Sequence, residues 1–146
     1  MTAWPRRQSA SAGDRRPPHA ATAPWHVDPR LRGRTYAIPF EDVWQAAVRI
    51  ADGGARGWRL IRADDQEGLI TAEATTLVLR FVDDVEIRVT LDETAQTRVD
   101  AFSCSRRGRY DWHTNARRLR NLFRRLDRDV AAQHAARIGS RIGQPG

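Results

Sequence analysis

Hydrophobic and polar residues alternate along residues 85–91, and this period of two is typical of a half-buried strand. The alternation resumes over residues 97–103, after a short polar stretch. Folding the two runs about Thr94 sets Val89 opposite Val99. The pattern therefore predicts an antiparallel hairpin with one apolar face, in that register.

Two further segments have hydrophobic residues at helical spacing. The first runs from Phe40 to Ala51, with Pro39 at its start and Gly53 soon after its end. The second lies near the end of the chain, where most of the remaining positions are arginine. Its apolar stripe consists of Leu119, Leu122, Phe123, Leu126 and Val130. Both segments are predicted to be amphipathic helices.

Short strand-like runs at residues 58–61 and 69–74 lie between the first helix and the hairpin. Residues 77–81 either continue the second of these strands beyond a kink or form a separate short strand. The expected order is α-β-β-β-β-α, and consecutive strands with short turns favour an antiparallel meander. We therefore predict an α+β fold, with a four-stranded antiparallel sheet and both helices packed on one face.

The chain divides into three parts by composition. Residues 1–34 hold five of the seven prolines, so we predict a disordered basic arm. A single α+β domain is expected over residues 35–138, and a frayed tail over residues 139–146. No apolar run is long enough to span a membrane, and the N-terminus lacks the apolar segment of a secretory signal. Because one cysteine cannot form an internal disulfide, we expect a cytoplasmic location.

Charge is distributed unevenly along the chain, whose net charge is +7. Seven arginines and two acids occur in residues 1–38, and eleven arginines and three acids in residues 105–146. The middle is acidic. The basic ends either bind nucleic acid or another polyanion, or neutralise the acidic sheet of the same or a neighbouring chain. The expected basic surface of the last helix consists of Arg117, Arg118, Arg120, Arg124, Arg125 and Arg128.

The densest polar cluster lies just before that last helix and consists of Arg109, Asp111, Trp112, His113 and Asn115. Enzymes use His with Asp for proton transfer, but no Ser or Cys nucleophile with a suitable base accompanies this pair. We therefore predict no catalytic residue, metal site or cofactor. Asp111 and Asn115 are expected to bind the backbone of the loop and so fix the helix on the sheet.

Asp83 and Asp84 form the most prominent carboxylate pair. Adjacent residues of a strand point to opposite faces, so the two carboxylates are not expected to act together as acid and base. We predict a structural role for them, accepting hydrogen bonds from loop amides or from Arg109.

Several short motifs resemble the bacterial and plastid family catalogued as domain of unknown function 1499 (DUF1499). The resemblance covers about residues 37–127 and implies a fold, whereas the family carries no established activity. The matching motifs are Pro39–Trp44, Gly57–Trp58, Phe81–Val89, Thr97–Asp100, Gly108–Asp111 and Asn115–Arg118.

Taken together, these patterns favour a small binding or accessory domain rather than an enzyme. We expect a protein partner, bound through the solvated sheet face or the arginine-rich helix. The alternative is non-specific binding of nucleic acid or an anionic surface through the arm and that helix. A third hypothesis is a small-ligand or enzymatic site at Arg109, Asp111 and His113.

Overall fold

The computed structural model describes residues 18–107 and 113–143. Within those residues the chain forms six strands, two α-helices and two short helical turns. In chain order they are β1 (His19–Ala21), the 3-10 turn η1 (Pro29–Leu31), β2 (Arg34–Tyr36), α1 (Phe40–Arg49), the π-helical turn η2 (Ile50–Gly54), β3 (Trp58–Asp64), β4 (Leu69–Thr75), β5 (Val82–Leu91), β6 (Thr97–Ser105) and α2 (Thr114–Ile142).

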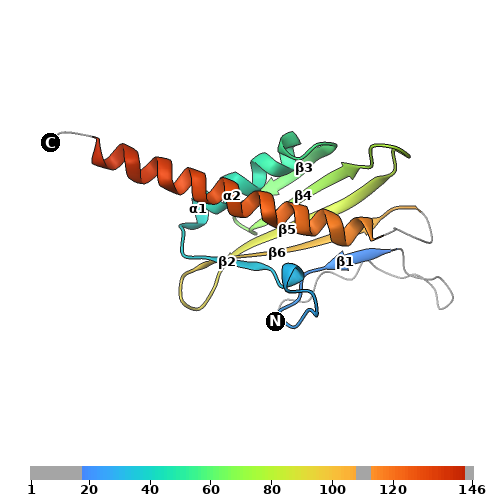
Figure 1. Ribbon diagram of the computed structural model, residues 1–146, viewed down its shortest axis with the longest axis horizontal. Coiled ribbons are helices and arrows are strands. Elements are labelled where there is room, and N and C mark those ends of the chain that lie inside the picture. Colours follow the sequence, from blue (N-terminus) through green and yellow to red (C-terminus); the bar gives the residue numbers. More distant parts are fainter. Residues whose placement is uncertain (1–17, 108–112, 144–146) are drawn as a thin grey trace.

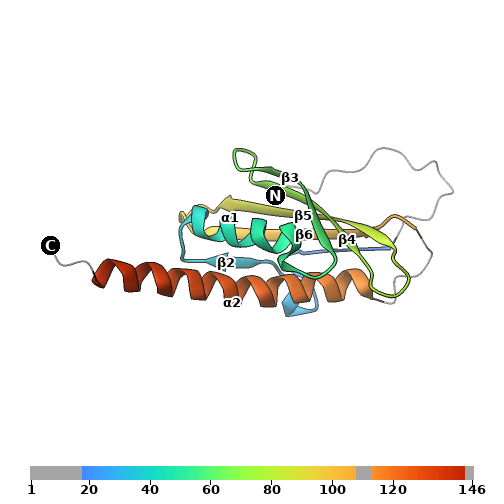
Figure 2. The ribbon, with the colours of Figure 1, turned by 90° about the horizontal axis from the view of Figure 1, so that it is seen from above.

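The strands form one antiparallel sheet in the order β1-β6-β5-β4-β3, and β2 also pairs with β6. Figures 1 and 2 show α1 and α2 on the same face of this sheet, with α2 crossing its length. The α+β class, the antiparallel pairing and the placement of both helices on one face are confirmed.

The β5–β6 hairpin has the register that the alternation predicted, with Val89 opposite Val99. Its turn is organised by Asp92, whose Oδ1 accepts hydrogen bonds from the backbone amides of Thr94 at 2.8 Å and Gln96 at 2.9 Å. This local chemistry favours the turn that sets the register of the hairpin.

The core fills the space between the inner sheet face and the two helices. Both predicted apolar stripes pack into it, although Phe40 and Val48 of the first stripe are only partly buried, and Pro39 precedes the first helical residue as expected. Its largest fully buried side chains include Val43, Ile50, Ile70, Ile87, Val99, Leu119, Phe123 and Leu126.

The sheet has six strands rather than the expected four. Residues 18–34, which composition placed in the disordered arm, contribute β1, η1 and the first residue of β2, and Leu31 is only 3% exposed in the core. Both short strands pair with β6, whose edge would otherwise present unpaired amides and carbonyls to solvent. The rest of the expected arm, residues 1–17, lies outside the described residues.

Residues 77–81 form neither of the two strands considered. Because β4 pairs with β5 from Thr75 opposite Val82, residues 76–81 form the loop that closes this hairpin. Thr76 N donates to Phe81 O at 2.8 Å, and Arg80 has a positive φ of 52°.

Helix α2 is longer than expected. It ends at Ile142, so the first residues of the stretch expected to fray are helical, and it projects beyond the sheet (Figures 1 and 2).

Candidate functional site: a basic groove beside α2

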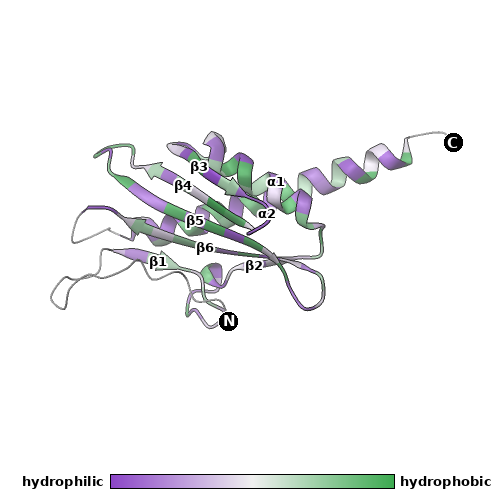
Figure 3. Cartoon of the chain, turned by 180° about the vertical axis from the view of Figure 1, so that it is seen from behind, coloured by the Kyte–Doolittle hydropathy of each residue, from purple (hydrophilic) through white to green (hydrophobic). Residues whose placement is uncertain are grey.

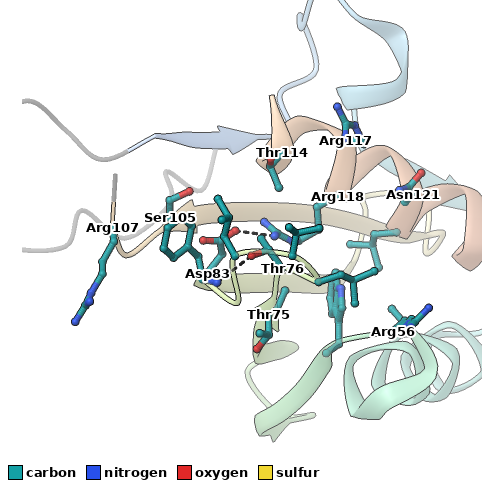
Figure 4. A pocket seen from close by; sticks show the side chains of 18 of the residues that line it. Arg56, Thr75, Thr76, Asp83, Ser105, Arg107, Thr114, Arg117, Arg118 and Asn121 are labelled. Atoms are coloured by element: carbon teal, nitrogen blue, oxygen red, sulfur yellow. Dashed lines mark hydrogen bonds and ion pairs between the residues drawn. The ribbon is translucent and has the colours of Figure 1, made fainter. Parts of the chain in front are cut away.

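A groove with a volume of about 570 Å³ opens between the N-terminal half of α2, the β4–β5 loop and the segment after η2 (Figure 4). Strand β5 contributes to it through Asp83, and the end of β6 through Ser105. Segments far apart in the sequence therefore build one concave surface.

One side of the groove is an aliphatic wall formed by the β4–β5 loop. The wall consists of the aliphatic side chains of Leu77, Val78 and Leu79 together with the aromatic ring of Phe81, and all four side chains are exposed. Val78, at the turn, is 89% exposed. Scattered exposed hydrophobic residues are common in proteins, but a contiguous exposed group beside a hollow marks an interaction site.

Arginines surround the rest of the groove. Arg117 and Arg125 come from α2, Arg56 from the segment after η2, and Arg107 from the segment after β6. None of these four forms an ion pair with a carboxylate in the part of the chain that the structure describes. The groove therefore presents positive charge that the carboxylates of residues 18–107 and 113–143 leave uncompensated.

The carboxylate that lines the groove, Asp83, is already bound. Arg118 Nη2 donates to Asp83 Oδ2 at 2.6 Å, and the side chains are 8% and 4% exposed respectively. Figure 4 shows the two side chains meeting at the centre of the groove, while Arg56, Arg107 and Arg117 lie around its margin. Their contact joins α2 to β5 beneath the open space.

A buried hydrogen-bond network extends from Arg118 to the neighbouring strand. Arg118 Nη1 donates to Ser103 Oγ and to Asn115 Oδ1, each at 3.0 Å. Asn115 Nδ2 donates to Ser105 Oγ at 2.8 Å and to Pro18 O at 3.2 Å. The network ties the first turn of α2 to β6 and to the residue before β1. The bond expected from Asn115 to the backbone of the preceding loop stays a prediction.

Asp84 lies on the opposite sheet face, as the strand geometry predicted. Arg106 Nη2 binds both Asp84 Oδ1 at 2.7 Å and Glu73 Oε1 at 2.6 Å. Hydrogen bonds from Arg106, and then from Arg59, lower the pKa of Glu73, while Asp84 and Glu73 raise the pKa of the Arg106 guanidinium. Figure 3 shows both hydrophilic and hydrophobic residues along this outward face.

The polar cluster predicted before α2 is described only in part. Arg109, Asp111 and Trp112 lie outside the described residues, so the structural role expected for Asp111 stays a prediction. His113 is exposed and has a φ of 59°, immediately before the first residue of α2. Asn115 lies in the buried network rather than in a solvent-facing site.

The six arginines predicted to form one basic surface differ in their surroundings. Arg118 is buried, against expectation, because it faces Asp83 beneath the helix. Arg120 binds Asp28 at 3.2 Å, and Arg128 binds Asp129 at 3.2 Å. Arg124 donates a hydrogen bond to Asn121, whereas Arg117 and Arg125 line the groove.

A sequence signal for the buried network existed and was missed. Asn115, Arg118, Leu119 and Leu122 fall at i, i+3, i+4 and i+7, so the apolar stripe of α2 continues through two polar residues. Polar side chains on a buried stripe require buried partners, and Asp83 lies on the facing strand. By contrast, no sequence pattern indicated that the β4–β5 loop would line one groove together with Arg56 and Arg117.

A family model described as "Protein of unknown function (DUF1499)" matches residues 5–126, which is most of the chain. The chain belongs to the DUF1499 family. The DUF1499 match extends from before β1 into α2, so all of the residues that line the groove fall within it. A comparison with curated proteins gives no match.

Two features of the described part of the DUF1499 chain bear on its chemistry. Residues 18–107 and 113–143 contain no group of three or more His, Cys, Asp or Glu side chains placed to hold a metal ion. None of the helices in that part is long and apolar enough to cross a membrane.

Proposed function

We propose that this protein is a non-catalytic binding domain, and that its groove binds a partner carrying anionic and apolar groups together. The supporting observation is the exposed aliphatic wall at residues 77–81 facing arginines that have no carboxylate partner in the described chain. Guanidinium groups bind carboxylates, phosphates and sulfonates, and the wall can cover an attached hydrocarbon.

The state of Asp83 supports binding rather than catalysis. A general base must accept a proton from a substrate, but the Asp83 carboxylate is committed to a buried ion pair with Arg118. The residues lining the groove thus offer cations and apolar surface, which can bind a partner that carries anionic and apolar groups.

Two partner classes have the required chemistry in the cytoplasm, where we place the protein because its single cysteine suits a reducing compartment. One is an acidic, amphipathic segment of another protein, bound beside the arginine-rich helix. The other is an anionic lipid. Both present negative charge next to hydrocarbon.

Binding of nucleic acid through the arm and α2 is the weaker alternative. Three of the six α2 arginines are engaged with carboxylates: Arg118 with Asp83, Arg120 with Asp28, and Arg128 with Asp129. These contacts interrupt a continuous basic stripe. The aliphatic wall at the groove has no counterpart in the phosphate-dominated contacts of non-specific nucleic-acid binding.

The test is a fluorescence titration of the full chain with anilinonaphthalene sulfonate, a probe that joins a sulfonate to aromatic rings. We expect Arg117→Gln and Leu79→Ser each to weaken binding about tenfold, which corresponds to losing one charge-assisted or apolar contact. Arg141→Gln is the control, because it removes the same charge from the same helix away from the groove. Equal affinity of all four proteins would refute the proposal.

A further inference from the structure

We propose that the groove and its aliphatic wall dock this protein on an anionic lipid surface, with the β4–β5 loop inserted among the lipids. This inference rests on the proposed function and names the partner. The loop presents exposed apolar side chains, and arginines lie beside it.

The loop is built to present hydrocarbon outward. Leu77, Val78 and Leu79 are consecutive and exposed at the turn. The loop is closed at its base by two hydrogen bonds, from Thr76 N to Phe81 O at 2.8 Å and from Phe81 N to Thr76 Oγ1 at 2.9 Å. A closed turn can enter the boundary between headgroups and acyl chains while its base keeps these polar groups paired.

Several arginines lie in or near the β4–β5 loop. Arg80 belongs to the loop itself and is exposed. Arg117 and Arg125 line the same groove from α2, and Arg56 lines it from the segment after η2. Arginines beside an inserted apolar group can bind lipid phosphates through several donors each.

The arrangement favours a lipid surface over a protein segment. A protein interface obtains most of its affinity from side chains packed in a well-fitted pocket. Here Val78 points away from such packing, at 89% exposure, and the arginines lie around the margin of the groove rather than converging on one point (Figure 4). A membrane accepts a protruding loop without matching its shape, and it offers many phosphates at once.

The experiment measures co-flotation of the full chain with vesicles of two compositions. One is phosphatidylcholine alone, and the other contains about one third phosphatidylglycerol. We expect binding to the anionic vesicles, little binding to the zwitterionic ones, and weaker binding as salt is raised.

Two matched pairs of variants locate the contact. Val78→Asp should weaken anionic-vesicle binding at least fivefold, whereas Val27→Asp should not, although Val27 is 90% exposed. Arg117→Gln should weaken binding about fivefold more than Arg141→Gln does, because it removes a charge next to the surface. Unchanged melting temperatures would verify that the variants are folded.

The outcomes separate this inference from the proposed function. The docking inference would be overturned if the chain bound zwitterionic and anionic vesicles equally. It would also be overturned if Val78→Asp left binding to the anionic vesicles unchanged. Loss of vesicle binding together with normal, groove-dependent binding of anilinonaphthalene sulfonate would overturn it too, yet would leave the proposed function standing and point to a protein segment. Failure of both probes would refute both proposals.

Discussion

At the scale of single residues, the decisive contact is the ion pair between Asp83 and Arg118. Removing two charges from water is costly, so such a pair adds little stability relative to a well-packed apolar pair. Removing either side chain of the pair is nevertheless strongly destabilising, because the remaining charge would be buried without a partner. The pair therefore holds α2 in one position over β5, at the centre of the groove.

Replacing Asp83 with Asn should lower the free energy of unfolding by about 3–5 kcal/mol, since the Arg118 charge would stay buried and unpaired. Urea denaturation measures this loss. Asp84→Asn provides the comparison, because Asp84 binds the partly exposed Arg106 on the outer face, where we expect a loss of at most about 1 kcal/mol. Similar losses for both variants would contradict the assignment.

Another residue-scale prediction concerns Asp28, which caps η1. Hydrogen bonds from the Arg30 side chain and backbone lower its pKa to about 2, with a smaller effect from Arg120 on α2. A lowered pKa means that the ionised form stabilises the fold above about pH 4, and that this stabilisation is lost as pH falls towards 2.

The difference in melting temperature between the native chain and Asp28→Asn should therefore be largest above about pH 4 and vanish near pH 2. Asp65→Asn, at an exposed position in the β3–β4 turn, serves as the control. A difference that stays constant across this range would show that Asp28 has no such role.

At the scale of elements, the sequence predicts a segment well when its partner is close along the chain. The β5–β6 register follows from an alternating pattern and a turn closed by Asp92, all within one stretch. Strands β1 and β2 were missed because three residues carry no recognisable period, and proline-rich composition is typical of disorder. Their pairing partner β6 lies far along the chain, where no local pattern points to it.

The groove was missed for a related reason. Its aliphatic residues at 77–79 have strand-like composition, and burial is the usual fate of such a run. The pairing of Thr75 with Val82 leaves them in a loop instead. Which arginines face that loop depends on how α2 crosses the sheet, and that geometry depends on the whole packed core.

At the scale of the whole molecule, the free edge of β6 is covered by the beginning of the described chain. β1 pairs with residues 102–104 and β2 with residues 97–99. Between them, Thr22 N donates to Ala101 O at 2.9 Å, and Ala101 N donates to Thr22 Oγ1 at 3.1 Å. This edge is thus protected from pairing with another molecule.

A chain that begins at Gly33 should have a lower melting temperature than one that begins at Pro18, and it should self-associate. The shorter chain loses Leu31 from the core and exposes the β6 edge at residues 101–104. Thermal denaturation and light scattering compare the two. Equal stability and equal scattering would contradict a structural role for residues 18–32.

The covering of β6 also has a consequence during protein synthesis. Ribosomes release β1 and β2 first, whereas β6 emerges only after the other strands. β1 and β2 therefore stay without their partner β6 until almost the entire sheet has left the exit tunnel. The two strands of the sheet that are synthesised first are therefore among the last to pair, and chaperones can bind them in the interval.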